Sequence, residues 1–157
     1  MIAIGIPNFG KLNLKFLVMD FNGTLAVDGE LQSGVADRLR ILSTKLSLYV
    51  VTADTFGTVK SQLKPLPVEI VVLDGPDNQS KAKEAFVAKL GAAQTAAIGN
   101  GRNDRLMVAR ARVGLAVMLS EGASTETVTA ADVVVAKIED ALDLFLNPLR
   151  LKATLRA

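Results

Sequence analysis

The stretch KFLVMDFNGT, residues 15–24, decides the fold of this chain. Its first part is an apolar run that ends in a charged residue, Asp20, as is typical of a strand buried in the middle of a sheet. Asn22 and Gly23 follow as a turn. In open α/β sheets reactive groups collect at the carboxyl ends of strands. The stretch therefore predicts a central strand with candidate reactive residues at its end.

Outward from this strand, short apolar runs alternate with helical segments, which predicts an α/β fold with a mainly parallel sheet. Further strands are expected at Leu48–Thr52, Val68–Leu73, Thr95–Ile98, Val113–Val117 and Asp132–Val135. Helices are expected over about Ser33–Lys45, with Ser33 as the cap, and over Thr55–Leu63, Ser80–Leu90 and Ile138–Leu146, with another after Asp104. Asp28-Gly29 predicts a hairpin over Ala26–Glu30, and residues 2–7 an added edge strand. No repeat or linker divides the chain, so we expect a single domain over residues 1–157.

The composition excludes several classes of function. The 157 residues include no Cys and no His, which excludes disulfides, thiolate nucleophiles and imidazole bases. Aromatic residues make up only 4%, which argues against a nucleic-acid partner that stacks its bases on them. The chain has neither an apolar run of about 18 residues nor a signal-peptide pattern, so we expect a cytoplasmic protein without a membrane partner.

The predicted strands end in residues that suit phosphoryl transfer. Asp20 is a candidate nucleophile whose attack on phosphorus would give an acyl phosphate. Thr52, at the end of the second strand, offers a hydroxyl to the phosphate, and Asn22 and Gly23 form a turn beside it. These residues predict a phosphate-binding edge of the sheet.

Oxygen ligands for a divalent cation gather at the same edge. The fourth strand ends in GNGRND, residues 99–104, which supplies the Asn100 and Asn103 amides and the Asp104 carboxylate. Together with Asp20 and the main-chain carbonyl of Asn22, they would hold Mg²⁺ against a phosphate oxygen.

A lysine would neutralise the charge that develops during the transfer, and two lysines begin the helix over 80–90. Lys83 precedes Val87 by four residues and Leu90 by seven, so it shares the helix face that packs on the sheet. Lys81 lies roughly 200° around the helix from Lys83. We therefore favour Lys83, with Lys81 as the alternative.

In order along the chain, these residues resemble the motifs of the haloacid dehalogenase superfamily: a strand followed by Asp-x-Asp-Gly-Thr, a strand ending in Thr or Ser, a Lys, and Gly-Asp-Gly-x-Asn-Asp. ARVGLAVMLSEG and AADVVV extend the match to about residue 135, where it looks most like the phosphorylation domain of P-type ATPases and the small proteins called soluble P-type ATPase-like. The resemblance implies a three-layer, Rossmann-like fold. It also implies a Mg²⁺-dependent phosphohydrolase, a phosphatase or ATPase-like enzyme, that acts through an aspartyl phosphate on Asp20.

Two positions depart from the usual motifs, and both have Asn in place of Asp. Asn22 stands where relatives have the Asp that protonates the leaving group, and an amide cannot do general acid–base work near neutral pH. Asn100 replaces a metal-ligating Asp, which should weaken Mg²⁺ binding. P-type ATPases also lack an acid at the position of Asn22, so the resemblance implies slow hydrolysis of the phospho-aspartate and a preference for acyl or anhydride phosphates.

The spacing of the motifs leaves no room for a cap domain. Residues 24–52 hold one hairpin and one helix, and residues 52–83 hold one helix and one strand. The resemblance implies that such a protein acts on a large phosphorylated substrate or forms a homo-oligomer in which a neighbour covers the open site. An apolar hairpin surface around Leu25, Val27 and Leu31 would support the oligomer, but these residues could equally belong to the core.

The alternative function is a catalytically weakened phosphate- or metal-binding regulatory protein that keeps the fold. It predicts that Asn22→Asp, alone or with Asn100→Asp, restores activity to an inert parent.

Overall fold

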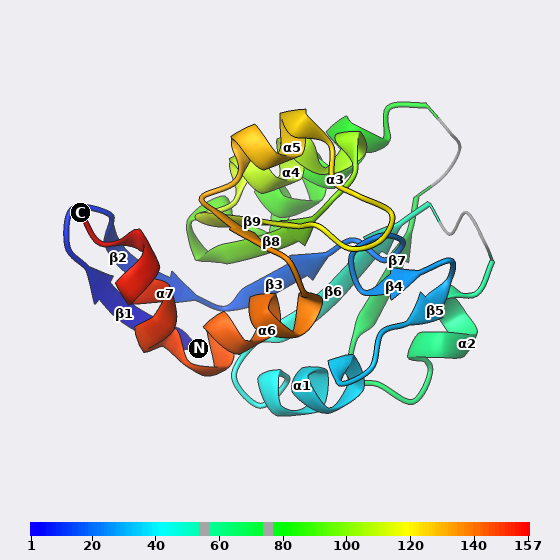
Figure 1. Ribbon diagram of the computed structural model, residues 1–157, viewed down its shortest axis with the longest axis horizontal. Coiled ribbons are helices and arrows are strands. Elements are labelled where there is room, and N and C mark those ends of the chain that lie inside the picture. The colour runs from blue at the N-terminus through cyan, green and yellow to red at the C-terminus, as the bar shows by residue number, and fades with distance from the viewer. Residues whose placement is uncertain (54–56, 74–76) are drawn as a thin grey trace.

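Six parallel strands form the central sheet of the protein, as seen in a computed structural model of residues 1–157 (Figure 1). The structure describes residues 1–53, 57–73 and 77–157. In spatial order the strands are β10 (Val133–Val135), β9 (Val113–Val117), β8 (Thr95–Gly99), β3 (Phe16–Met19), β6 (Ser47–Thr52) and β7 (Glu69–Val72). The predicted strand in residues 15–24 thus lies between β8 and β6, and the predicted parallel sheet is confirmed.

Helices cover both faces of the sheet, which gives the predicted three layers (Figure 1). One face carries α3 (Gln79–Leu90), α4 (Arg105–Arg110) and α5 (Thr125–Ala130). The other carries α1 (Val35–Leu42), α2 (Val59–Leu63) and α6 (Ile138–Leu146). Two short 3₁₀ turns, η1 (Ala92–Gln94) and η2 (Arg102–Asp104), lie before β8 and before α4.

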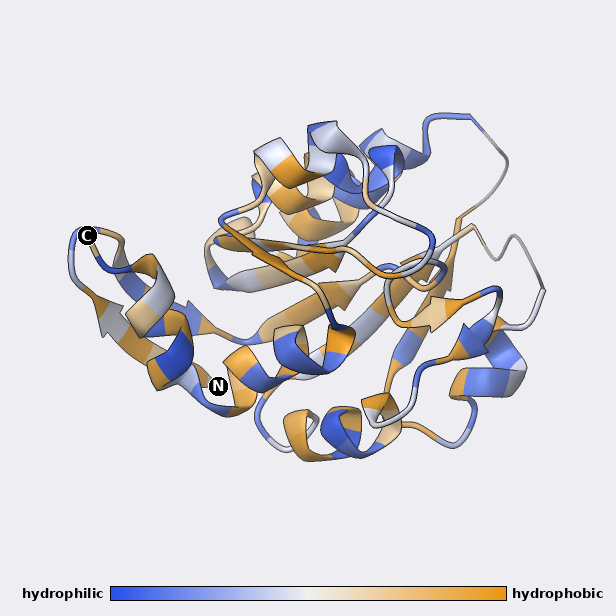
Figure 2. Ribbon diagram, viewed as in Figure 1, coloured by the Kyte–Doolittle hydropathy of each residue, from blue (hydrophilic) through white to orange (hydrophobic). Residues whose placement is uncertain are grey.

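The central strand is apolar throughout because both of its faces are buried (Figure 2). Leu17 and Met19 belong to the larger core cluster, which includes Leu39 of α1 and Phe145 of α6. Val18 points the other way, into the cluster that contains residues of α3 and α4. Alternate side chains of one strand therefore fasten the two helical layers to the sheet.

The N-terminal prediction was wrong. Residues 2–7 add no strand to the central sheet. Instead β1 (Ile2–Ile6) pairs with β2 (Gly10–Leu14) in a separate antiparallel hairpin, packed against α7 (Pro148–Leu155) (Figure 1). The turn between the strands includes Asn8 at a φ of 59°, and an asparagine tolerates this left-handed conformation better than most residues.

The C-terminal helix α7 is not predicted by the sequence pattern, because Pro148 indicates the end of the preceding helix. Pro148 is in fact the first residue of α7, where its missing N–H breaks no helical hydrogen bond. The predicted cap of α1 was also wrong. The capping residue is Gly34, at a φ of 76°, not Ser33, and the helix ends at Leu42.

Most of the remaining elements follow the expectations closely, but α5 and the 3₁₀ turn η1 were not predicted. The Asp-Gly hairpin is present as β4 (Ala26–Val27) and β5 (Glu30–Leu31). The predicted start of α2, at Thr55, lies outside the described residues. Among the helices that the structure describes, none has both the length and the hydrophobicity needed to cross a bilayer.

Candidate active site

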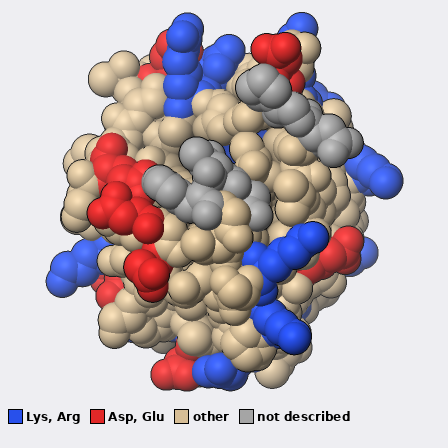
Figure 3. Space-filling view, turned by 90° about the vertical axis from the view of Figure 1, so that its right-hand side faces the viewer, with Lys and Arg blue, Asp and Glu red and all other residues tan. Residues whose placement is uncertain are grey.

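The three predicted strand ends meet at one edge of the sheet. Asp20 follows β3, Thr52 ends β6, and Asn100 follows β8, and these strands are neighbours in the sheet. The backbone N–H of Asp20 donates to the carbonyl of Ile98, 3.0 Å away, which fixes the end of β3 beside that of β8. Figure 3 looks onto this edge and shows charged side chains around its rim.

Lys83 joins the two predicted site carboxylates. Its Nζ lies 2.6 Å from Oδ1 of Asp20 and 2.6 Å from Oδ1 of Asp104. Lys83 and Asp104 are fully buried, and Asp20 is 7% exposed. Lys81 is an exposed residue on the same helix. The helix-face argument for Lys83 therefore agrees with the structure.

The electrostatics of this cluster follow from its burial. Loss of hydration raises the pKa of Asp20 to about 6, aided by the negative charge of Asp104 and opposed by Lys83. Burial by itself would lower the pKa of Lys83, but the two carboxylates outweigh it and raise that pKa. Above pH 6 the site therefore contains an ionised Asp20 beside a firmly protonated Lys83.

Asp104 also shapes the loop after β8. Its Oδ2 accepts hydrogen bonds from the backbone N–H of Asn100, at 3.0 Å, and of Gly101, at 2.9 Å. A Cβ at Gly99 would stand only 2.5 Å from the Cβ of Asp104, so this close approach requires glycine. One carboxylate thus orders the loop with one oxygen and anchors Lys83 with the other.

Asn100 is positioned by contacts that the sequence does not reveal. Its Oδ1 accepts a hydrogen bond from Thr24 Oγ1 at 3.0 Å, and its Nδ2 donates to the carbonyl of Gly122 at 3.0 Å. The amide also lies against Gly23, where a Cβ would come within 2.2 Å of Nδ2. A carboxylate in the same place would set an oxygen against the Gly122 carbonyl oxygen. The amide at position 100 therefore fits this site better than the usual acid.

Further contacts tie the same loop to α5. Thr127, buried on α5, donates from its hydroxyl to the Gly101 carbonyl at 2.6 Å, and the Ser124 N–H donates to the Asn100 carbonyl. Thr24 could have been singled out from its place in the Asp-x-Asn-Gly-Thr motif. Gly122 ends the matched stretch ARVGLAVMLSEG, but nothing in that stretch indicates a contact with Asn100, and Thr127 lies in no motif.

Other predicted residues take the following places. Asn22 lies in the turn after β3, and its Oδ1 is buried without a hydrogen-bond partner among the described residues. Thr52 is buried at the end of β6. Leu25 is fully buried in the core, while Val27 and Leu31 are partly buried, so the hairpin does not present all three as an apolar surface.

The oxygen-rich donor set fits a hard cation such as Mg²⁺. The ligands available are the Asp20 carboxylate, Asn100 Oδ1 and the carbonyl of Asn22. The unpartnered Oδ1 of Asn22 adds a buried acceptor to this region. Asp104, which the sequence predicts as a further ligand, accepts hydrogen bonds on both of its oxygens and therefore also orders the loop that carries Asn100.

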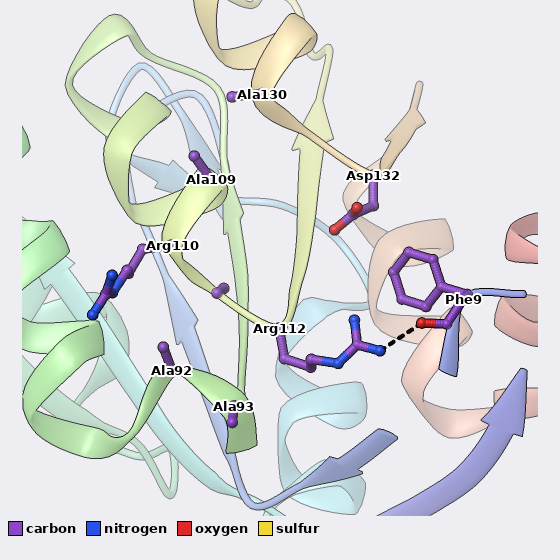
Figure 4. A pocket seen from close by; sticks show the side chains of 9 residues that line it. Phe9, Ala92, Ala93, Ala109, Arg110, Arg112, Ala130 and Asp132 are labelled. Carbon is purple, nitrogen blue, oxygen red and sulfur yellow. Dashed lines mark hydrogen bonds between the residues drawn. The ribbon is translucent and has the colours of Figure 1, made fainter. Parts of the chain in front are cut away.

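A cavity at the opposite end of the sheet involves none of these residues. It has a volume of about 350 Å³ and lies before the starts of β8, β9 and β10 (Figure 4). Arg112 borders it, with its guanidinium 4.6 Å from the centre of the Phe9 ring and a 2.8 Å hydrogen bond to the Phe9 carbonyl. This contact fastens the β1–β2 hairpin to the sheet.

Solved structures with a similar fold include phosphatases and a putative hydrolase of the haloacid dehalogenase superfamily from Legionella pneumophila, which matches with a TM-score of 0.68 at 18% identity, over 91% of this chain and 87% of that one. A cobalt-bound deoxy-D-mannose-octulosonate 8-phosphate phosphatase from Haemophilus influenzae matches with a TM-score of 0.70 at 17% identity, over 92% of this chain and 94% of that one. The 3-deoxy-D-manno-octulosonate 8-phosphate phosphatase from Moraxella catarrhalis, with magnesium and phosphate, matches with a TM-score of 0.65 at 21% identity, over 86% and 87%. The chain therefore has the haloacid dehalogenase fold, as its motifs predicted.

Comparison of sequences finds relatives of higher identity than these structures. No family model matches the chain. Two uncharacterized proteins of Methanocaldococcus jannaschii match it. MJ0073 is 53% identical over 60 residues, which are 38% of this chain and 64% of that protein. MJ0072 is 44% identical over 39 residues, which are 25% of this chain and 89% of that protein. The match thus spans less than two thirds of the length of MJ0073 and most of that of MJ0072. The chain belongs to the same family as MJ0072. A particular closeness to P-type ATPases stays a prediction.

Proposed function

We propose that this protein is a Mg²⁺-dependent phosphohydrolase that acts through an aspartyl phosphate on Asp20. The observation that carries the proposal is Lys83, fully buried between the carboxylates of Asp20 and Asp104. Removing three ionised groups from water costs more than most folds recover from pairing them. A role in a reaction therefore explains this buried charge cluster better than a contribution to stability does. The similarity of the fold to that of known phosphatases supports phosphate hydrolysis as the reaction.

The proposed reaction has two steps, phosphorylation of Asp20 and hydrolysis of the resulting acyl phosphate. A carboxylate oxygen of Asp20 bonds to phosphorus as the bond from phosphorus to the leaving group breaks, and the leaving group departs with the bonding electrons. Lys83 neutralises the charge around the nucleophile, and the Thr52 hydroxyl donates to a phosphoryl oxygen. Water then cleaves the acyl phosphate, which frees inorganic phosphate and restores Asp20.

Mg²⁺, when bound, would neutralise negative charge on the phosphoryl oxygens. We propose that Asp20, Asn100, Asp104 and the main-chain carbonyl of Asn22 hold it, and that Asp104 also orders the loop of Asn100. Gly23 and Asn22 would border the bound phosphate.

Asn22 limits what leaving groups the site can serve. Its amide cannot protonate a poor leaving group or activate water, steps that typically contribute 10²–10⁴-fold. We therefore expect phosphoryl transfer from acyl or anhydride phosphates, followed by slow hydrolysis of the phospho-aspartate. The substrate would be large, or a second copy of the chain would cover the site.

The test is phosphate release from acetyl phosphate, with Mg²⁺ and with EDTA. We expect turnover only with the metal, and none in Asp20→Asn. The alternative, a regulatory protein with a weakened site, predicts an inert parent that gains activity in Asn22→Asp. No turnover by the parent over a broad panel of phosphates, with or without Mg²⁺, would contradict the proposal.

A further inference from the structure

A polar cavity borders the proposed active site on the side of α3 and α4. Its volume is about 460 Å³. We call it the basic pocket and define it by six of its lining residues: Ser80, Lys81, Arg102, Asn103, Arg105 and Leu106. Ser80 precedes Lys83 by one helical turn, roughly 5 Å along α3. Asn103 directly precedes Asp104. The same two segments that place Lys83 and Asp104 therefore also form the wall of this pocket.

The pocket carries an excess of positive charge. Lys81, Arg102 and Arg105 line it, and no acidic residue does so in the described part of the chain. Glu126 of α5 pairs with both arginines, at 2.7 Å from Arg102 Nε and 3.1 Å from Arg105 Nε. Lys81 makes no ion pair within residues 1–53, 57–73 and 77–157. Glu126 thus balances part of the charge of the two arginines and none of that of Lys81, which leaves the pocket attractive to a further anion.

Hydrogen bonds hold the walls of the pocket in place before any ligand arrives. The Arg105 guanidinium donates to Ser80 Oγ at 3.2 Å and to the Arg102 carbonyl at 2.9 Å. Asn103 Nδ2 donates to Gln79 Oε1 at 2.9 Å. These bonds join the start of α3 to η2 and α4. A ligand would therefore lose little binding free energy in ordering the site.

We propose that the basic pocket binds a second anionic group, a carboxylate or a phosphate, on the molecule whose phosphoryl group is transferred. The inference rests on the proposed function for the position of that phosphoryl group. It specifies the substrate as an acyl phosphate or phosphate anhydride that carries a second anionic group, rather than a compound whose only anionic group is the phosphoryl group to be transferred. The first turn of α3 contains no acidic residue, so it adds no repulsion toward such an anion.

The test measures binding without turnover, by calorimetry in excess Mg²⁺. The probes are methylphosphonate, which has one anionic group, and phosphonoacetate, 3-phosphonopropionate and 4-phosphonobutyrate, which add a carboxylate at increasing reach. A counterpart with two phosphonate groups, propane-1,3-bisphosphonate, distinguishes a preference for a phosphate-like group from one for carboxylate. We expect at least one two-anion probe to bind about tenfold more tightly than methylphosphonate, since bonds to charged groups are among the stronger ones.

The variant is Lys81→Glu, and Lys89→Glu is its control. Both residues are exposed on α3, and both changes alter the net charge equally, but Lys89 lies in the last turn of the helix. An acid in the first turn stabilises a helix, so Lys81→Glu should keep its melting temperature. Lys81→Gln removes the charge without reversing it. We expect Lys81→Glu to lose the tenfold preference, Lys81→Gln to lose part of it, and Lys89→Glu to keep it.

The outcomes separate this proposal from the proposed function. Equal affinity of the wild type for all probes, or an equal loss for methylphosphonate and the two-anion probes in Lys81→Glu, would overturn the basic pocket. If the wild type prefers two-anion probes but turns over no phosphate, anion binding in the basic pocket is supported and the phosphohydrolase proposal is contradicted. If it turns over acetyl phosphate but shows no preference among the probes, the phosphohydrolase proposal is supported and anion binding in the basic pocket is contradicted.

Discussion

The two ends of the central sheet place a cation in different surroundings. At the carboxyl end, Lys83 is fully buried between the carboxylates of Asp20 and Asp104. At the amino end, Arg112 is only partly buried, and it contacts two neutral groups, the ring and the carbonyl of Phe9 (Figure 4). Asp132 borders the same cavity, but its Oδ2 accepts from the Gly114 N–H instead.

These surroundings indicate different roles: the Arg112 contact stabilises the fold, whereas the Lys83 contacts prepare a reaction. A guanidinium over an aromatic ring, with a carbonyl as acceptor, stabilises a structure without burying opposed charges. A buried ammonium between two carboxylates costs stability, yet it provides an ionised nucleophile with its charge already balanced. The predictions that follow test this contrast, from the largest effect to the smallest.

Lys83→Met should have the largest effect, because it leaves two buried carboxylates facing each other. We expect phosphoryl transfer to fall by about 10³-fold and the free energy of unfolding to fall by about 3–5 kcal/mol. Rapid-quench measurement of the phospho-enzyme and urea unfolding would check both. Lys89→Met, at the exposed far end of α3, is the control and should change neither. Normal phosphoryl transfer by Lys83→Met would contradict the placement of the active site at the carboxyl end of the sheet.

Asn22→Asp should change one step only. The new carboxyl group can activate water, so we expect hydrolysis of the phospho-aspartate to accelerate by about 10²-fold. Formation of the phospho-enzyme from acetyl phosphate should change much less, because its leaving group needs no proton. Single-turnover kinetics would separate the two steps. Unchanged hydrolysis would show that Asn22 does not limit the reaction.

Asn100→Asp should reduce activity, although it restores the residue that relatives carry. The carboxylate would place an oxygen against the Gly122 carbonyl, 3.0 Å from the present Nδ2. We expect about 1–3 kcal/mol less stability from the lost donor, and about tenfold weaker transfer at saturating Mg²⁺ from a displaced loop. Thermal unfolding and initial rates would check this. Higher activity at equal stability would show that the amide is a defect, not a fitted residue.

Arg112→Met should have the smallest effect and none on the reaction. It removes the contact with the Phe9 ring and the hydrogen bond to its carbonyl, so we expect about 1–2 kcal/mol less stability. Phosphoryl transfer should stay within about twofold of the wild type, since the change is at the far end of the sheet. Urea unfolding and initial rates would check this. A large loss of transfer would mean that the two ends are coupled.

The sequence is sufficient for features that depend on periodicity and order. The apolar run before Asp20 predicts the central strand, and the spacing from Lys83 to Val87 and Leu90 predicts which lysine faces the sheet. Strand ends in a parallel sheet meet at one edge, so the order of the motifs is enough to bring Asp20 and Asp104 together.

Contacts between distant segments cannot be predicted in this way. The hydrogen bond from Asn100 to Gly122 depends on where the loop after β9 lies, and neither residue has a motif that points to the other. Pro148 misleads because a proline can both end one helix and begin the next. Residues 2–6 form their backbone hydrogen bonds with β2 in a hairpin. The local sequence pattern does not distinguish such a hairpin strand from an edge strand of the central sheet.

The most direct test of Asp20 as a nucleophile is the mass of the intact protein after brief mixing with acetyl phosphate and Mg²⁺. The account predicts an added mass of one phosphoryl group, located on Asp20 by peptide mapping, released by hydroxylamine and missing in Asp20→Asn. An unmodified wild-type protein under these conditions, or the same adduct in Asp20→Asn, would contradict it.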